Sequence, residues 1–177
     1  DVERSRGLGD VYKRQMYKTV VFDLDGTLLN TLTDLADAGN RLCRKYGWPT
    51  HERQAYRYFV GNGIPKLVER LAPADQRTPA VLEAALADFK RDYGQHLRDT
   101  TAPYPGIPEM LAKLKANGVQ LAVFSNKADA LAKEVVKDYF GTQYFTIVRG
   151  QMTGVAPKPA AEGTNALLPV SYTHLRA

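Results

Sequence analysis

A short apolar run followed by two carboxylates constrains the fold of this chain more than any other feature. The run is Thr19-Val20-Val21-Phe22, and Asp23-Leu24-Asp25-Gly26-Thr27 follows it directly. Because the run is continuous rather than alternating, it predicts a strand that is buried on both faces, as in a parallel sheet. Both carboxylates then stand at the carboxyl end of a strand, where open α/β sheets bind their ligands.

The spacing of these carboxylates favours phosphoryl transfer. One carboxylate can attack phosphorus as a nucleophile, the other can pass a proton to the leaving oxygen, and a hard cation can neutralise the charge that gathers there. The same Asp-x-Asp-Gly start also opens calcium loops. Such a loop needs Gly at its sixth position and Glu at its twelfth, where this chain has Leu28 and Asp34, so the pattern disfavours calcium binding.

Helical patterns fill the next part of the chain and then alternate with strands. Residues 31–98 show helical periodicity and no strand pattern, and Thr78 is a candidate N-cap ahead of Pro79. After a linker at 99–105, the alternation predicts a parallel, doubly wound (Rossmann-like) α/β sheet with an all-helical insert after the first strand. The expected helices are 31–46, 52–59, 64–71, 78–97, 107–117, 128–139 and one that begins near Ala160, and the further strands are 119–124 and 145–148.

Two further strand ends carry polar side chains. Ser125 and Asn126 follow the strand at 119–124, and Lys158 lies between two prolines after the strand at 145–148. We expect Ser125 and Lys158 to meet the two carboxylates at one edge of the sheet. At an effective dielectric of ~20, unit charges ~4 Å apart interact by about 4 kcal/mol, so the ammonium can offset the repulsion between a carboxylate and a phosphate. A helix N-cap is the alternative interpretation of Ser125, and the two roles are compatible.

Composition disfavours several other classes of protein. The chain has 177 residues, 44% of them hydrophobic, which suits one domain or one domain with an insert. The net charge of +5 comes from scattered residues, so we expect no nucleic-acid partner. No apolar stretch approaches the ~20 residues of a membrane span, so we expect no membrane partner. Cys43 is the single cysteine, which predicts a packing role and a reducing, cytoplasmic location.

The two ends of the chain differ from the rest. Residues 1–15 and 169–177 have no helical or strand period, and Met16 opens a clean strand. We interpret both ends as non-native or disordered tails. On this interpretation the parent protein continues past Leu168 and the chain is a fragment.

With these residues in view, the chain resembles the haloacid dehalogenase superfamily of phosphohydrolases, and within it the phosphoglycolate phosphatases. The resemblance covers residues 16–168. Its motifs are Phe22-Asp23-Leu24-Asp25-Gly26-Thr27-Leu28, Val123-Phe124-Ser125-Asn126-Lys127 and Pro157-Lys158-Pro159, in the order that the family uses.

The resemblance implies a role for each matching residue. Asp23 would be the nucleophile and a Mg²⁺ ligand, and Asp25 would be the general acid/base and would bind the metal through its backbone carbonyl. Ser125 and Lys158 would bind the phosphoryl group. The segment Val60-Gly61-Asn62-Gly63 with Lys66 resembles the family's cap loop that faces the phosphate. Together the implied substrate contacts are Gly26, Thr27, Gly61, Asn62, Gly63, Lys66, Ser125, Asn126 and Lys158.

The resemblance also implies a domain division and one departure from the family. Residues 31–98 would form a helical cap, and 16–30 with 99–168 would form the α/β core. The family's fourth motif, an acidic pair on the next strand, has no counterpart after Lys158, where Glu162 is the only acid. We therefore expect a core that is incomplete at the C-terminus, weak Mg²⁺ binding and an open apolar edge at the first strand.

The expected function of the full-length parent is Mg²⁺-dependent hydrolysis of a small phosphorylated metabolite, 2-phosphoglycolate, through an aspartyl-phosphate. The chain by itself is expected to be inactive or nearly so. A phosphosugar mutase and a nucleotide or pyrophosphate hydrolase are alternatives with the same chemistry. A module that binds a phosphorylated ligand without catalysis is the alternative from a different class. The sequence does not indicate an oligomeric state.

Overall fold

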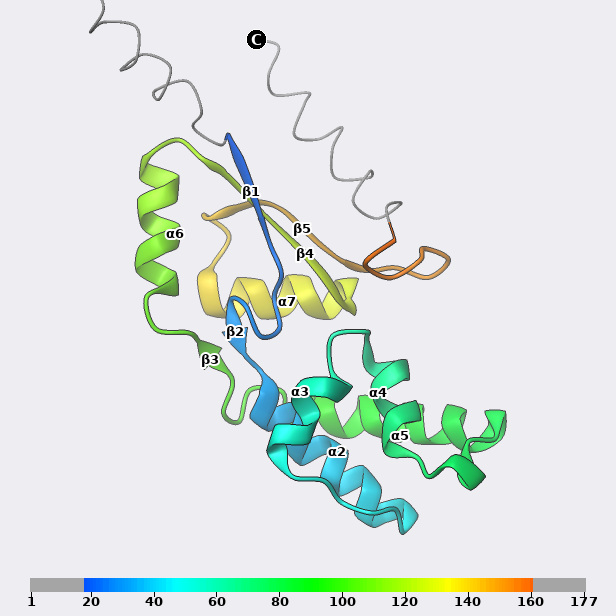
Figure 1. Cartoon of the computed structure of the whole chain (residues 1–177). Coiled ribbons are helices and arrows are strands. Elements are labelled where there is room, and N and C mark those ends of the chain that lie inside the picture. The colour runs from blue at the N-terminus through cyan, green and yellow to red at the C-terminus, as the bar shows by residue number, and fades with distance from the viewer. Residues whose placement is uncertain (1–17, 161–177) are drawn as a thin grey trace, which may run out of the picture.

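A three-stranded parallel sheet forms one half of the molecule. The structure is a computed structural model that describes residues 18–160. The strands are β1 (Thr19–Phe22), β4 (Gln120–Ala128) and β5 (Phe145–Gln151), in the order β1-β4-β5 (Figure 1). Thr19 pairs with Gln120 and Phe22 pairs with Val123. The carboxyl end of β1 therefore lies beside the middle of β4.

Two helices connect and cover these strands. Helix α6 (Ile107–Ala116) precedes β4, and α7 (Asp129–Phe140) leads from β4 to β5 and packs against both. Gly118 follows α6 with a φ of +74°, the left-handed conformation expected of a glycine just past a helix end. The alternation of helix and strand confirms the predicted parallel α/β fold.

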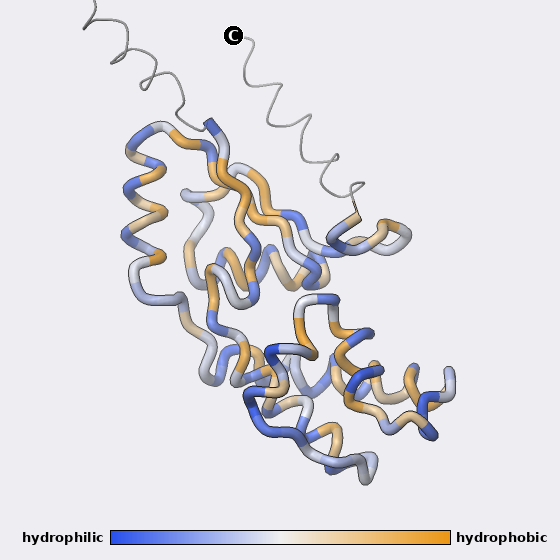
Figure 2. Tube along the Cα trace, viewed as in Figure 1, coloured by the Kyte–Doolittle hydropathy of each residue, from blue (hydrophilic) through white to orange (hydrophobic). Residues whose placement is uncertain are grey.

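Four helices form a separate layer, which we call the helical layer (residues 32–96). They are α2 (Leu32–Tyr46), α3 (Tyr56–Phe59), α4 (Ile64–Leu71) and α5 (Pro79–His96), with 3₁₀ turns η1 (Arg53–Ala55) and η2 (Ala74–Gln76). Thr78 accepts a hydrogen bond from Val81 N, which confirms the predicted N-cap of α5. Figure 2 shows hydrophobic residues along the sheet strands and within the helical layer, and the buried side chains of both form one cluster.

Two connections join the helical layer to the sheet, and they lie side by side. The entering strand β2 (Leu29–Asn30) pairs antiparallel with the leaving strand β3 (Ala102–Pro103), a pairing that the sequence did not predict. Asp34, at the start of α2, is buried and accepts hydrogen bonds from the backbone N–H and hydroxyl groups of Thr100 and Thr101. One carboxylate thus holds both connections together.

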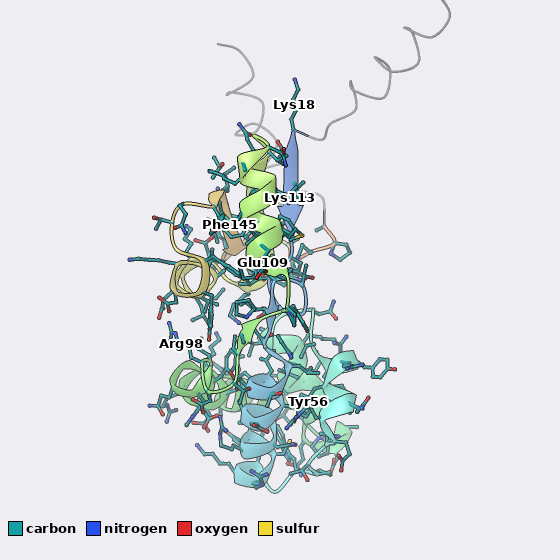
Figure 3. The ribbon with its side chains drawn as sticks, turned by 90° about the vertical axis from the view of Figure 1, so that its left-hand side faces the viewer. Lys18, Tyr56, Arg98, Glu109, Lys113 and Phe145 are labelled. Carbon is teal, nitrogen blue, oxygen red and sulfur yellow. The ribbon has the colours of Figure 1, made fainter. Side chains whose placement is uncertain are left out.

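An ion pair adds a further contact at this junction. The Arg98 guanidinium, just after α5, donates to Glu134 and Asp138 of α7. Figure 3 shows Arg98 between α7 and the helical layer, with Tyr56 inside that layer and Phe145 on the side of the sheet. All three partners are largely exposed, so the pair is a surface contact of modest strength.

Two predictions about the strands are wrong in detail. Strand β1 is not buried on both faces, because it is one of the two outer strands of the sheet among the described residues and Val21 is 52% exposed. Strand β4 runs to Ala128 instead of 124, since its pairing with β5 continues as far as Ala128 and Gln151. Ser125 therefore lies within a strand and is not a helix N-cap.

Some predictions fall outside the described part of the chain. The helix expected near Ala160 and the tails at 1–15 and 169–177 belong to this group. Within residues 18–160, none of the helices has the length and apolar character that a membrane span requires.

Candidate active site

A small cavity of about 60 Å³ lies between the carboxyl end of β1, strand β4 and the helical layer. Residues from both halves of the molecule line it, so it is the point at which the helical layer covers the sheet. The polar lining groups are four of the residues predicted at the strand ends, together with two that were not predicted, and Lys158 is not among them. The lining residues are Asp23, Asp25, Leu35, Val60, Gly61, Gly63, Ile64, Leu67, Tyr93, Ser125, Asn126 and Lys127.

Asp23 and Lys158, which are far apart in the sequence, are in direct contact. The Lys158 ammonium donates to Asp23 Oδ1 over 2.8 Å and to the Phe124 carbonyl over 2.7 Å. Leu24 N also donates to Asp23 Oδ1, over 2.8 Å. Within residues 18–160, both hydrogen bonds to Asp23 fall on Oδ1, so the second carboxylate oxygen has no partner among the described residues.

Asp25 forms an ion pair with a buried lysine that the sequence analysis gave no role. Lys127 Nζ lies 3.0 Å from Asp25 Oδ1 and 3.1 Å from the Tyr93 hydroxyl of α5. Burial lowers the pKa of Lys127, but the charge of Asp25 and the contacts with Tyr93 outweigh it, so the pKa lies above its ordinary value. The Lys127 amine thus lies within ion-pair distance of the Asp25 carboxylate.

The periodicity of a strand could have identified Lys127. Side chains two residues apart in a strand point to the same face, and Ser125 and Lys127 are both buried on β4 while Phe124 and Asn126 are only half-buried. Tyr93 had no such signal, since its position fits the apolar stripe of α5. Burial raises the pKa of the Tyr93 hydroxyl, which keeps it neutral as a partner for the lysine.

Ser125 and Asn126 both line the cavity, with different partners. Ser125 is buried, and its hydroxyl oxygen accepts a hydrogen bond from Lys127 N over 3.1 Å. The hydroxyl hydrogen of Ser125 is thus available for an acceptor in the cavity. The Asn126 carboxamide instead bonds to backbone groups of Gly61 and Lys158.

The other predicted contact residues divide into two groups. Gly61 and Gly63 line the cavity, so the segment after α3 does face the carboxylates. Asn62 and Lys66 line a neighbouring groove of about 790 Å³, and there Lys66 pairs with Glu69 over 2.6 Å. Gly26 and Thr27 lie in the exposed turn after β1 and do not line the cavity.

The described residues offer few ligands for a metal ion. Within residues 18–160, no three or more His, Cys, Asp or Glu side chains gather closely enough to hold one. Mg²⁺ in phosphate-handling sites is bound through one or two carboxylates plus substrate phosphate, and it keeps several waters. The Asp23 carboxylate, which has one oxygen without a partner among the described residues, fits this minimal kind of site.

Comparisons with known proteins agree with this geometry. The sequence profile described as haloacid dehalogenase-like hydrolase matches residues 20–171. The chain is 33% identical over 145 residues to a phosphoglycolate phosphatase of Thiobacillus denitrificans, covering 80% of this chain and 64% of that protein. It is 34% identical over 146 residues to a phosphoglycolate phosphatase of Neisseria meningitidis, covering 81% of this chain and 62% of that one. The chain thus spans less than two thirds of the length of these relatives.

A solved structure has the same fold. It is a provisionally named phosphoglycolate phosphatase from Lactobacillus delbrueckii subsp. bulgaricus, with a TM-score of 0.81 and 28% identity, covering 88% of this chain and 73% of that one. The profile match spans residues 20–171, which include every residue that lines the cavity as well as Lys158. The chain belongs to the haloacid dehalogenase-like hydrolase family.

Proposed function

We propose that the protein to which this chain belongs hydrolyses a small phosphomonoester, 2-phosphoglycolate, with Mg²⁺ and through an aspartyl-phosphate. Two relatives at 33% and 34% identity carry the name phosphoglycolate phosphatase. The observation that carries the proposal is the contact of 2.8 Å between Lys158 Nζ and Asp23 Oδ1 beside a cavity that Ser125 and Asp25 line. An ammonium in that position can hold a phosphate dianion near a carboxylate that would otherwise repel it.

Asp23 is the proposed nucleophile. Its Oδ1 is held by Leu24 N and Lys158, which leaves Oδ2 to attack phosphorus. The new Oδ2–P bond forms as the bond from phosphorus to the substrate's bridging oxygen breaks. Water then attacks the phosphorus of the aspartyl-phosphate, which releases inorganic phosphate and restores the carboxylate.

Asp25 is the proposed general acid and base. It would give a proton to the bridging oxygen in the first half of the reaction and take one from water in the second half. Lys127 and Tyr93 orient it, since the lysine bonds to both. Because Tyr93 lies on α5, this orientation depends on the helical layer being in contact with the sheet.

The phosphoryl group would be bound by Ser125 and Lys158. The Ser125 hydroxyl can donate to one phosphoryl oxygen, and the Lys158 ammonium can pair with another. Mg²⁺, held by the Asp23 carboxylate and the Asp25 carbonyl, would neutralise charge on the phosphoryl oxygens. Asn126 and Lys66 are weaker candidates for substrate contacts, because one bonds to backbone groups and the other pairs with Glu69.

Residues 31–98 are the proposed cap over a core formed by 16–30 and 99–168. Gly61 and Gly63 of this segment line the cavity together with Asp23 and Asp25, which supports its role as a cap. Closure by the cap would keep water from the ester while Asp23 attacks. We also propose a cytoplasmic location, which the single cysteine supports.

The test is phosphate release from 2-phosphoglycolate, p-nitrophenyl phosphate and a nucleotide, each with Mg²⁺ and with EDTA. It compares wild type with Asp23→Asn, in the printed chain and in the longest reading frame of its source that contains it. We expect Mg²⁺-dependent hydrolysis of 2-phosphoglycolate by the longer protein, and its loss in Asp23→Asn. Turnover that survives this substitution would exclude Asp23 as the nucleophile. Binding of phosphate without turnover in either form would favour a non-catalytic binding module.

A further inference from the structure

The carboxamide of Asn126 bonds to two loops that come from different parts of the chain. Its Nδ2 donates to the Gly61 carbonyl over 2.7 Å and to the Lys158 carbonyl over 3.3 Å. Its Oδ1 accepts from Lys158 N over 2.8 Å. Gly61 belongs to the segment between α3 and α4 of the helical layer, and Lys158 belongs to the segment after β5. One side chain of β4 therefore contacts both.

Each of these two loops is also fixed on its far side. Arg70 of α4 donates to the Phe59 carbonyl over 2.8 Å and to Asn62 Oδ1 over 3.0 Å, which holds the loop that contains Gly61. The Lys158 ammonium in turn donates to Asp23 Oδ1 over 2.8 Å. A continuous series of contacts thus runs from α4 through the Gly61 loop and Asn126 to Lys158 and Asp23.

We infer that Asn126 is a positioning residue that couples the seating of the helical layer on the sheet to the position of the Lys158 ammonium. A planar amide makes these bonds together only when the Gly61 carbonyl and the Lys158 backbone are both in place. Coupling of this kind is reciprocal. Whatever holds the Lys158 loop, including an anion on its ammonium, stabilises the seated helical layer to the same extent.

Asn126 was expected to contact the substrate as part of the motif Val123-Phe124-Ser125-Asn126-Lys127, and its contacts indicate a different role. Its carboxamide is occupied by main-chain groups, so Asn126 acts on the substrate site through Lys158 rather than by touching substrate. The inference rests on the proposed function only in giving Lys158 and Asp23 a role in catalysis. The coupling between the Gly61 loop and the Lys158 loop can be measured without turnover.

Two substitutions at this position separate the two sets of contacts. Asn126→Asp keeps an oxygen that accepts from Lys158 N, and it removes the donor to the Gly61 carbonyl together with the longer bond of 3.3 Å to the Lys158 carbonyl. Asn126→Ala removes both. Asn117→Ala is the matched control, because Asn117 Nδ2 donates to a backbone carbonyl at the exposed end of α6, away from both loops.

The readouts are two NMR signals, one on each loop. Hydrogen exchange of the Lys158 amide reports the bond to Oδ1, and the ¹³C shift of the Gly61 carbonyl reports the bond from Nδ2. In Asn126→Ala we expect both to change, with exchange at Lys158 about fivefold faster, as the loss of one net hydrogen bond of about 1 kcal/mol implies. In Asn126→Asp we expect the Gly61 shift to change and the Lys158 amide to stay protected. If Asn126 merely stabilised the fold, both variants would change the Gly61 shift and the Lys158 exchange together.

Arg70→Met tests whether the effect travels between the loops, and it keeps the inference testable if Asn126→Ala does not fold. The hydrogen bonds of Arg70 within residues 18–160 go to Phe59 and Asn62 and not to Lys158, yet we expect Lys158 amide exchange to rise several-fold when this anchor on the Gly61 loop is lost. Arg91→Met, which removes an exposed pair with Asp88, should leave this exchange unchanged. An unchanged Lys158 amide in Arg70→Met, or identical effects of the two Asn126 variants, would overturn the inference. An inactive enzyme with the expected NMR pattern would refute the proposed function alone.

Discussion

Lys127 Nζ lies 3.0 Å from Asp25 Oδ1, and this ion pair joins β4 to the end of β1 inside the protein. The lysine side chain is only 4% exposed, and its other partner is the Tyr93 hydroxyl from the helical layer. The pair between Lys158 and Asp23 has the same chemistry, but its side chains are 25% and 45% exposed. The two aspartates therefore differ in what their removal leaves behind.

Asp25→Ala should destabilise the protein more than Asp23→Ala. Removing Asp25 leaves a buried ammonium with only a neutral partner, which costs about 3 kcal/mol of unfolding free energy, whereas an exposed pair contributes less than about 1 kcal/mol. Urea denaturation at pH 7 measures both changes. Adding Lys127→Met to Asp25→Ala removes the unpaired charge and should restore most of the loss. Equal destabilisation by the two single substitutions would contradict this account.

Asp34→Ala should be strongly destabilising although Asp34 lies outside the cavity. The substitution leaves the buried N–H and hydroxyl groups of Thr100 and Thr101 without their acceptor, and hydrogen bonds to a charged group contribute about 1.5–3 kcal/mol each. We expect a loss of at least about 3 kcal/mol in thermal or chemical unfolding. Asp37→Ala, at an exposed position on the same helix, is the control and should stay within about 0.5 kcal/mol of wild type. Similar losses in both variants would rule out the proposed role of the carboxylate.

Cys43 should resist alkylation as long as the protein is folded. The thiol is buried on α2, and burial raises its pKa from 9.0 to about 11. At pH 8.5 iodoacetamide should therefore label it only in urea, because the thiolate is the reactive form. Mass spectrometry of the two samples measures the difference, and fast labelling of the folded chain would show that the thiol is accessible.

The same thiol adds a pH dependence to stability. Because the pKa of the Cys43 thiol is raised in the folded state, the thiol ionises at lower pH in the unfolded chain than in the folded protein. The contribution of Cys43 to the free energy of unfolding is therefore present below about pH 9 and is lost as the pH rises toward about 11. Tyr56 and Tyr93 also have raised pKa values through burial, so wild type should lose stability throughout this range. In Cys43→Ala the decline between pH 9 and 10 should be smaller, and an unchanged decline would argue against the thiol as its source.

Val21→Lys should reduce aggregation with little effect on stability. Val21 is 52% exposed on β1, which is one of the two edge strands of the sheet among residues 18–160, and an apolar edge is a site for pairing between molecules. A lysine there opposes such pairing. Light scattering during incubation at 37 °C measures the effect. The control is Val20→Lys, which places a charge against the core and should destabilise the protein instead.

Most helices and strands of this fold could be predicted from local sequence patterns. Gly118 ends α6 as expected, and Thr78 caps α5, because both features depend on neighbouring residues only. The two-residue strands β2 and β3 could not be predicted, since they are stabilised by each other although residues 31–101 separate them in the sequence. The exposure of Val21 has a similar cause, because the number of neighbours that a strand has is a property of the sheet and not of the strand.

The candidate site was predictable where residue type and strand end coincide. Asp23, Asp25, Ser125 and Lys158 stand at or near such ends, and the structure brings Lys158 against Asp23 and Ser125 into the same cavity as both carboxylates. Their catalytic roles stay predictions. Lys127 was missed because the strand was expected to end at 124, and Tyr93 was missed because it fits an apolar helix face. Their importance comes from a contact between two segments that the sequence does not relate.

The contact of Asp34 with Thr100 and Thr101 has a consequence for how such proteins diversify. The chain enters and leaves the helical layer at adjacent points. Asp34, at the entry, accepts hydrogen bonds from Thr100 and Thr101 at the exit. The segment between those points can lengthen, shorten or be exchanged for another without altering the registration of the sheet. The lining that the helical layer gives the cavity can therefore change by remodelling a single insertion while the polar groups of β1 and β4 are inherited intact.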